Sequence, residues 1–416
     1  MAAPDNDGLT SPGRRAFLVQ TTGSLAGVAL MPDLERIGPR RLQEPKKIGV
    51  VGVGRQGRAV VAELAKIDGA RVGALCDTDA GRLQIGLDRA SGAEGFGDHR
   101  AMLDKRRDLD AVIVATPTHL HRSIVEDALA AGKHVYCEAP LAHTVDDARA
   151  IAAAAHAATN QIFMAGFLAR SNPVYQLART FYRTDAFRDF VGGSARYHRK
   201  TSWRFPSATA EGERLANWLL DPAVSIGLAG EMASHQLDVF HWFRNKVPVS
   251  VIGTGMVAAN RDGRTVPDTI NALFRFDDGT SVSYEASLGN SFGGQDEVLR
   301  GTNAAFRLAW THGWMFKEVD ATTLGWEVYA LRQQFHQDEG IILIADATKL
   351  AAQGQLKAGV GLPYSPLYYG LADFLRSVAF PNVPVSCGAM EGLRTTIVGI
   401  LANQAVISGT AVEITT

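Results

Sequence analysis

A glycine-rich turn between an apolar strand and a helix constrains the fold of this chain more than any other feature. The turn occupies residues 52–57, directly after an apolar run over 47–51, and an amphipathic pattern predicts a helix over 58–66. A second apolar run over 71–76 ends at Asp77. This order predicts a strand–helix–strand unit of a parallel sheet, with the glycine-rich turn at its carboxyl edge.

The glycines of this turn have separate roles in binding a dinucleotide. Gly52 allows the tight turn, Gly54 leaves space for a pyrophosphate, and Gly57 lets the helix approach the strand. Arg55 and Gln56 begin the helix, whose free N–H groups and partial positive charge favour phosphate. A glycine-rich turn without a ligand is the alternative, and the complete unit around it argues against that alternative.

Asp77 indicates which dinucleotide the turn would bind. It follows the last glycine by about twenty residues, the separation of the acid that binds the ribose hydroxyls. A carboxylate there accepts hydrogen bonds from both hydroxyls and repels a 2′-phosphate. We therefore expect NAD as the cofactor, rather than NADP.

Two domains follow from the order of the elements. Strands and helices alternate as far as about residue 170, which predicts a doubly wound parallel sheet. Longer alternating segments then predict antiparallel strands in an α+β domain. The predicted domains are a leader and linker over 1–44, a Rossmann domain over 45–170 and an α+β substrate domain over 171–416. The helices that end the chain are candidates for packing back on the Rossmann domain.

The second half has a recognisable set of elements. Strands are predicted over 190–199, 249–258, 269–276, 281–286, 298–302 and 305–308. Residues 277–280 predict a hairpin turn that joins two of these strands. One helix is predicted over 228–243, and two helices over 368–379 and 390–408 close the chain.

Composition excludes several classes of function. The 416 residues carry a formal net charge of -1, which argues against nucleic acid as the main partner. Cys76, Cys137 and Cys387 form no CxxC pair and lie in no His/Cys cluster. We therefore expect buried structural thiols and no metal site.

The first residues resemble an export signal. Arg14 and Arg15 stand before Phe17 and Leu18, and a weakly apolar stretch over 19–31 follows. That stretch is too short for a membrane span, and the order of features is typical of a twin-arginine leader. The alternative is a disordered tail with two accidental arginines. A twin-arginine leader predicts a periplasmic or otherwise exported protein that the export machinery carries in folded form.

Several motifs resemble the glucose–fructose oxidoreductase, inositol dehydrogenase and rhizopine-catabolism (Gfo/Idh/MocA) family. They lie at 110–121, 130–138, 230–238, 299–302 and 401–405. The resemblance covers essentially everything after Lys46. It implies an oxidoreductase with a Rossmann domain, followed by a large open, mainly antiparallel sheet. It also implies sugars or cyclitols as substrates and a homo-dimer or homo-tetramer.

The resemblance places several residues on the nicotinamide side of the cofactor: Thr116, Pro117, His119, His121 and Glu138. The two histidines have an alternative role, as residues that make local hydrogen bonds where a helix begins. Glu138 ends a strand at the edge of the sheet where ligands bind in open α/β folds.

One departure from the family pattern bears on the chemistry. The family has Glu-Lys-Pro where this chain has Glu138-Ala139-Pro140, so the lysine that contacts the reacting hydroxyl is missing. Another cation could replace that lysine, His235 could act without it, or ordinary dehydrogenase chemistry could be lost. The candidate cations are Arg170, Arg196, Arg199 and Lys200.

A second motif retains an acid and a histidine. Glu231 and His235 are predicted on one helix face, with Asp238 about one turn further. The resemblance implies that His235 accepts the hydroxyl proton while Glu231 orients it. The alternative is an acid near a helix start and a histidine satisfied by packing. The weaker candidates for substrate contact are Arg170, Tyr197, Trp203 and Asp238; Trp203 and Trp218 have core or interface packing as their alternative.

Three functions remain open at this stage. The first is an NAD-dependent oxidoreductase that transfers hydride between a sugar or cyclitol carbon and the nicotinamide. The second is a redox-neutral, NAD-dependent glycoside hydrolase, because relatives of that kind also lack the lysine. The third is a non-catalytic binding protein that depends on the dinucleotide.

Overall fold

The computed structural model describes residues 45–207, 209–345 and 361–416, so the predicted leader over 1–44 lies outside the described residues. The first domain contains a six-stranded sheet in the order β3-β2-β1-β4-β5-β6, and all neighbouring strands are parallel. This is the doubly wound parallel sheet that the sequence predicts. Its strands are β1 Lys46–Val51, β2 Ala70–Cys76, β3 Glu94–Phe96, β4 Ala111–Val114, β5 His134–Cys137 and β6 Phe163–Ala165.

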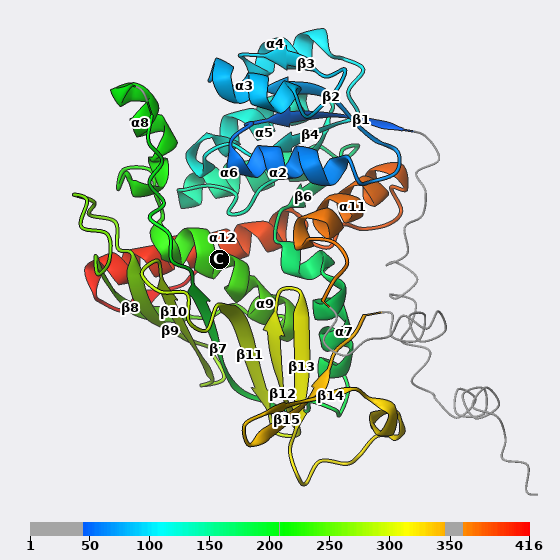
Figure 1. Cartoon of the computed structure of the whole chain (residues 1–416), viewed down its shortest axis with the longest axis vertical. Coiled ribbons are helices and arrows are strands. Elements are labelled where there is room, and N and C mark those ends of the chain that lie inside the picture. The colour runs from blue at the N-terminus through cyan, green and yellow to red at the C-terminus, as the bar shows by residue number, and fades with distance from the viewer. Residues whose placement is uncertain (1–44, 208, 346–360) are drawn as a thin grey trace, which may run out of the picture. The chain divides into compact units, whose positions relative to one another are not determined.

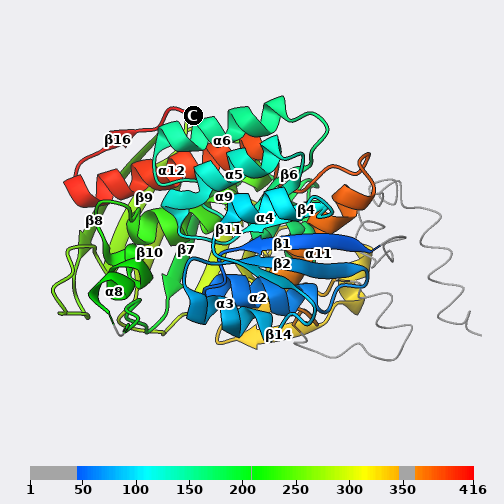
Figure 2. The same ribbon diagram turned by 90° about the horizontal axis from the view of Figure 1, so that it is seen from above.

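Helices cover both faces of this sheet (Figures 1 and 2). The central strand β4 is wholly buried: Val112 and Val114 pack in one core with α5 and α6, while Ala111 and Ile113 pack in another with α2 and α11. A strand covered on both faces is apolar throughout, which explains its sequence. The helices of this domain are α2 Arg55–Leu64, α3 Ala80–Leu87, α4 His99–Lys105, α5 His121–Ala130 and α6 Val145–Ala157.

The second domain contains a ten-stranded sheet in the order β14-β15-β13-β12-β11-β7-β10-β9-β8-β16. Strand β7 is antiparallel to β11 but parallel to β10, so the prediction of a purely antiparallel strand over 190–199 was wrong on one side. A parallel neighbour requires a long crossover, and the segment between β7 and β8 supplies it. The strands are β7 Phe190–His198, β8 Ser250–Met256, β9 Thr269–Arg275, β10 Ser281–Ser287, β11 Gln295–Gly301, β12 Ala304–Ala309, β13 His312–Lys317, β14 Arg332–Phe335, β15 Asp338–Ile342 and β16 Val412–Glu413.

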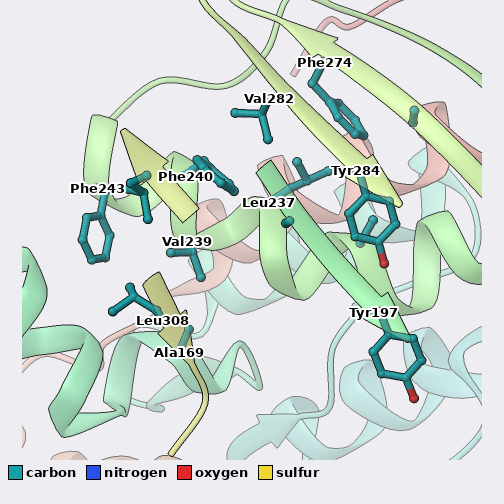
Figure 3. Close-up of a cluster of buried hydrophobic side chains, with 14 of the residues drawn as sticks. Ala169, Tyr197, Leu237, Val239, Phe240, Phe243, Phe274, Val282, Tyr284 and Leu308 are labelled. Carbon is teal, nitrogen blue, oxygen red and sulfur yellow. The ribbon is translucent and has the colours of Figure 1, made fainter. Parts of the chain in front are cut away.

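One face of this sheet is buried against helices. In β9 the residues Ile270, Ala272 and Phe274 are buried and their neighbours are exposed, which is the alternation of a half-covered strand. Figure 3 shows Phe274 grouped with Leu237 and Phe240, which come from the helix that crosses the sheet. The helices of this domain are α7 Pro173–Tyr182, α8 Ala210–Ala216, α9 Ser234–Arg244, α11 Pro366–Ala379 and α12 Ala389–Ser408.

The two closing helices connect the domains. Leu371 and Phe374 of α11 pack in the Rossmann core beside α2. In α12, Ile397 belongs to the other Rossmann core, whereas Val398 and Ala402 belong to the core under the large sheet. The hydrophobic cores of the two domains therefore share one helix. Within the described ranges, no helix combines the length and the apolar character that a membrane crossing requires.

The helix predicted over 228–243 is divided. A π-helical turn, η5, occupies Ala229–Ala233, and α9 begins only at Ser234. Its close neighbour is α12, where a Cβ on Gly399 would lie 3.3 Å from the Cα of Gly230. The prediction of one regular helix over 228–243 was therefore wrong, because the turn that carries Glu231 is π-helical.

Candidate active site

The glycine-rich turn joins β1 to α2 at the carboxyl edge of the parallel sheet. Gly52 has a φ of +89°, and a Cβ on it would lie 2.6 Å from the backbone oxygen of Ala115. A Cβ on Gly57 would lie 1.8 Å from the oxygen of Gly52, so only glycine allows α2 this close. A Cβ on Gly54 would meet nothing within 4 Å. The turn is tight against the protein and open at Gly54, as a pyrophosphate site requires.

The start of α2 and the end of β2 complete a dinucleotide site. Gly54 caps α2, and no side chain in the described part of the chain accepts from the N–H groups of its first turn. Those N–H groups remain for an anion. Asp77 accepts hydrogen bonds from the N–H groups of Val53 at 2.7 Å and Asp79 at 2.9 Å, which fix its carboxylate beside the turn. Its remaining lone pairs suit ribose hydroxyls, so the residues present fit a dinucleotide.

The loop after β4 brings a second group of predicted residues to the same edge. Thr116, Pro117 and His119 are all partly exposed there. The His119 ring lies 6.0 Å from that of Trp218, and burial together with the neighbouring His143 lowers its pKa. Among the described residues its Nδ1 has no hydrogen-bond partner. His119 therefore remains a candidate for contact with a bound ligand.

His121 has the alternative role considered in the sequence analysis: it makes local hydrogen bonds that hold the loop after β4. Its side chain is buried, with Nε2 at 3.0 Å from the oxygen of Thr116 and Nδ1 at 3.2 Å from that of Leu141. Burial lowers the pKa of His121 to about 4, so the ring is neutral. Because both ring nitrogens face backbone oxygens, the structure does not support the predicted cofactor contact.

Glu138 directly follows β5 and is buried. Its Oε1 accepts a hydrogen bond from the Gln56 side chain at 2.9 Å, which connects α2 to the end of β5. Burial raises the pKa of Glu138 to about 7, while the Gln56 bond opposes the shift. Near neutral pH this carboxyl group can therefore hold or release a proton.

His235 lies beside Ala139, the position at which the sequence comparison with the family pattern predicts the loss of a lysine. Burial lowers the pKa of His235 to about 4, and the charge of Asp238 and a hydrogen bond with the Ala139 backbone partly oppose the shift. Its ring lies 5.5 Å from Phe167 and 6.4 Å from Trp310. Nδ1 has no partner among the described residues. The site therefore presents a neutral imidazole with a nitrogen able to accept a proton.

The side chain of Glu231 contacts a different group from the one that the sequence predicts. Its carboxyl group accepts a hydrogen bond from the Thr118 hydroxyl at 3.2 Å. Burial raises the pKa of Glu231 to about 8, so the group is mainly protonated at neutral pH. The expected carboxylate that orients His235 is thus replaced, in the ligand-free protein, by a neutral acid bonded to the loop after β4.

Arg170, the first of the candidate cations, is paired inside the protein. Its guanidinium donates two hydrogen bonds to Asp238, at 2.8 and 2.7 Å, and both side chains are buried. Thr395 of α12 donates a further bond to Asp238 at 2.9 Å. Because each charge neutralises the other inside the protein, the predicted substrate roles of Arg170 and Asp238 are not supported.

The other candidate cations are either paired with a carboxylate or exposed. Arg196 pairs with Asp296 at 2.7 Å, whereas Arg199 and Lys200 are exposed. Two further substrate candidates lie in the core under the large sheet, where Tyr197 is 7% and Trp203 5% exposed. Trp203 therefore has its alternative role, which is packing in the core. The burial of Tyr197 argues against its predicted contact with a substrate.

A segment of the second domain reaches over to the Rossmann edge. We call residues 199–207 and 209–228 the strap. Phe205 lies under the guanidinium of Arg55, 5.4 Å from ring centre to Cζ, and Trp218 approaches His119. Asn217 holds the strap in shape through hydrogen bonds to both backbone groups of Phe205, at 2.6 and 2.9 Å.

The elements around the site carry buried polar atoms that have no partner among the described residues. They include Thr116 Oγ1, His119 Nδ1, Ser234 Oγ, His235 Nδ1 and Trp310 Nε1. Buried polar groups are normally paired, so these atoms are candidates for contact with a polar ligand. Sequence reasoning missed Thr118 and Trp310. Thr118 lies within the recognised motif, but nothing local to Trp310 connects it to His235.

Two family models match the chain. One, described as an oxidoreductase family with an NAD-binding Rossmann fold, matches residues 46–167, and the other, the GFO/IDH/MocA C-terminal domain, matches residues 194–307. Together they match more than half of the chain.

Two curated relatives illustrate the similarity. An inositol 2-dehydrogenase of Salmonella typhimurium (strain LT2) is 28% identical over 203 residues, 48% of this chain and 55% of the relative. A glycosyl hydrolase family 109 protein of Shewanella amazonensis is 32% identical over 157 residues, 32% of this chain and 34% of the relative. The matched segments thus span about a third to about half of these relatives.

Solved structures resemble nearly the whole described fold. A levoglucosan dehydrogenase in complex with NADH and L-sorbose has a TM-score of 0.71 at 18% identity and covers 89% of this chain and 99% of that one. A scyllo-inositol dehydrogenase from Lactobacillus casei with NAD(H) and scyllo-inositol has a TM-score of 0.65 at 22% identity, with coverage of 89% and 99%. At these identities the likeness shows the fold. The two family models, which together match more than half of the chain, show that it belongs to the Gfo/Idh/MocA family of NAD-binding oxidoreductases.

Proposed function

We propose that this protein oxidises a ring hydroxyl of a sugar or cyclitol with NAD as the hydride acceptor. The observation that carries the proposal is the position of His235: a neutral imidazole with an unpartnered Nδ1, next to Ala139 at the ligand-binding edge of an NAD-binding domain. The printed names of the relatives, inositol 2-dehydrogenase and levoglucosan dehydrogenase, support polyhydroxylated rings as the substrate class.

His235 would serve as the base. A neutral imidazole accepts the hydroxyl proton as the carbon–hydrogen bond of the same carbon breaks. Bound NAD supplies the acceptor for the hydride; the glycine-rich turn and Asp77 would hold its pyrophosphate and ribose. Thr116, Glu138 and His119 would border its nicotinamide end. Asp77 disfavours a 2′-phosphate, so we propose NAD rather than NADP as the physiological cofactor.

We further propose that the protein is exported in folded form, on the basis of Arg14 and Arg15 in the leader. A homo-dimer or homo-tetramer is proposed as well. The outer face of the large sheet carries exposed apolar side chains, among them Ile252, Met256 and Leu273, which would be covered in such an assembly.

A redox-neutral glycoside hydrolase is the second candidate. Ala139 favours it, because a lysine is absent where a dehydrogenase of this family has one. Glu138 and Glu231, whose pKa values burial raises to about 7 and about 8, could donate a proton to a leaving group near neutral pH. In such a reaction the sugar is oxidised, loses its aglycone by elimination, adds water to the resulting double bond and is reduced again. The glycosyl hydrolase family 109 relative is the matching protein by name.

One experiment separates these functions. The purified protein is loaded with NAD, and absorbance at the nicotinamide band is followed while inositols, levoglucosan, free hexoses and nitrophenyl hexosides are added. Reduction of NAD after one of the ring compounds is added supports the dehydrogenase. Nitrophenol release without net reduction supports the hydrolase. Neither reduction nor cleavage with any ring, in protein that retains NAD, contradicts both and leaves the non-catalytic binding protein.

A further inference from the structure

Trp310 occupies an unusual backbone position at the domain junction. It is the first residue of the two-residue turn between β12 and β13, and Ala309 pairs with His312 across that turn. Its φ is +58°, a left-handed conformation that bulky residues rarely adopt. Tight hairpin turns of this length usually place Asn, Asp or Gly there, because those residues tolerate positive φ.

The surrounding structure holds Trp310 in this strained conformation from both sides. Its backbone N–H donates to the Tyr175 hydroxyl at 3.1 Å, and its backbone oxygen accepts from the Asn172 side chain. Tyr175 in turn donates to the buried carboxyl group of Glu297. Tyr175, Asn172 and Glu297 are all buried. Strain retained against such a cost, and held by buried hydrogen bonds, is most often found at functional sites.

The side chain of Trp310 faces the proposed site. Its ring lies 6.4 Å from the ring of His235, at an angle of 56°, and it packs against the Rossmann core that contains Tyr136 and Leu168. Its Nε1 is buried and has no hydrogen-bond partner among the described residues. An indole N–H is only a donor, so it needs an acceptor that the described residues do not provide.

We propose that Trp310 is a substrate-binding residue: its ring stacks on a face of the sugar or cyclitol ring, and its indole N–H donates a hydrogen bond to a ring hydroxyl. The inference rests on the proposed function, since it takes the ring whose hydroxyl His235 would deprotonate as its ligand. An aromatic face suits the C–H bonds of such a ring, and the N–H at its edge suits a hydroxyl oxygen.

The other tryptophans near this region have different partners. Trp203 is buried in the core under the large sheet, and Trp218 lies in the strap beside His119. Trp314 lies in the same hairpin as Trp310, but its Nε1 donates to Gln333 at 3.0 Å. Trp314 is therefore a matched control: a tryptophan of the same hairpin, with its N–H already satisfied.

The test compares Trp310→Phe, Trp310→Ala and Trp314→Phe in the full chain loaded with NADH. Binding of scyllo-inositol, myo-inositol, levoglucosan and L-sorbose is measured by calorimetry, and thermal midpoints and NADH affinity are measured in parallel. We expect Trp310→Phe, which keeps a ring but loses the N–H, to weaken ring binding about fivefold. Trp310→Ala should weaken it by one to two orders of magnitude, and Trp314→Phe should leave it unchanged. With a substrate, the loss should fall mainly on KM.

The outcomes separate the inference from the proposed function. If the wild-type protein binds a ring and all three variants bind it equally, Trp310 has no role in binding and the inference is wrong, whatever the protein catalyses. If the wild-type protein binds none of the four rings, the inference is also wrong. The proposed function is judged separately, by whether the wild-type protein reduces NAD with any ring of the wider panel. If Trp310→Ala loses NADH affinity together with ring affinity, a structural role replaces the proposed one.

Discussion

At the scale of single residues, burial decides the chemical state of the proposed site. The same loss of solvent that lowers the pKa of His235 to about 4 raises that of Glu231 to about 8. Both groups are therefore mainly neutral at pH 7, and this pair supplies a proton acceptor and a proton donor. A bound cofactor with a positive nicotinamide ring would favour the ionised form of Glu231 and the neutral form of His235.

Replacement of His235 tests its role as the base. His235→Gln should lower kcat by about two to four orders of magnitude, the range expected for loss of a general base, while NADH still binds. His156→Gln is the control, because His156 is exposed on α6 and distant in sequence from every site residue. The measurements are steady-state kinetics with the ring found in the panel and NADH fluorescence. Undiminished kcat in His235→Gln would remove the imidazole from the mechanism.

Sequence reasoning identified the chemistry of residues better than their partners. It named Arg170 and Asp238 as separate substrate candidates, yet they bind each other although many residues separate them in the chain. Local spacing carries no information about such pairs. Likewise, a tryptophan at 203 looks the same in a sequence whether it lines a site or fills a core, and its 5% exposure comes from the way the large sheet folds over it.

At the scale of elements, the turn between β1 and α2 allows a prediction in which one glycine variant is the control for another. Gly57→Ala should destabilise the protein and abolish NAD binding, because the new Cβ would lie 1.8 Å from the oxygen of Gly52 and force α2 away. Gly54→Ala should leave the thermal midpoint nearly unchanged, because its Cβ would meet nothing within 4 Å. That methyl group would instead occupy the space of a pyrophosphate, so NAD affinity should still fall at least tenfold.

Thermal unfolding and NAD titration of the two variants distinguish a loss of cofactor affinity from a loss of protein stability. If Gly54→Ala binds NAD as the wild-type protein does, the pyrophosphate does not lie against this turn. If both variants lose stability equally, the open space at Gly54 has been misjudged.

Elements with a strong local signal were predicted correctly, and those set by distant contacts were not. The helix predicted over 390–408 agrees with α12 to within one residue, because Gly409, which directly follows it, ends the helix in the left-handed conformation that favours glycine. The π turn over 229–233 lies against α12, which is remote in sequence, so local spacing does not reveal this environment. Likewise, the parallel pairing of β7 with β10 depends on the crossover, which alternation of apolar residues cannot reveal.

At the scale of the whole molecule, the buried titratable groups predict how stability depends on pH. Burial raises the pKa of Glu138 to about 7 and of Glu231 to about 8, above the ordinary 4.5. The stabilisation from their protonated forms is complete below about pH 4.5 and is lost as pH rises through 7 and 8. His121 and His235 have the opposite sign, since their stabilisation exists above 6.5 and is lost as pH falls towards 4. Between pH 6.5 and 8 the glutamates therefore determine the slope.

The ligand-free protein should become less stable between pH 6.5 and pH 8. Denaturant midpoints at the two pH values measure this loss, and the double variant Glu138→Gln, Glu231→Gln should show a smaller one. Some slope should persist, because burial also raises the pKa of Glu297 to about 8. Glu285→Gln, at an exposed position of β10, should match the wild-type slope. Equal slopes in the wild-type protein and the double variant would show that the two carboxyl groups are ionised in the folded protein.

The position of α12 has a consequence for how the chain is made. The helix spans Ala389–Ser408, and its residue Ile397 completes a core whose other members lie mostly between 51 and 167. During synthesis an apolar face of the NAD-binding domain therefore stays uncovered until α12 has left the ribosome. The domain translated first cannot be the domain finished first, and a nascent chain that stalls before this helix would be a substrate for chaperones rather than a binder of NAD.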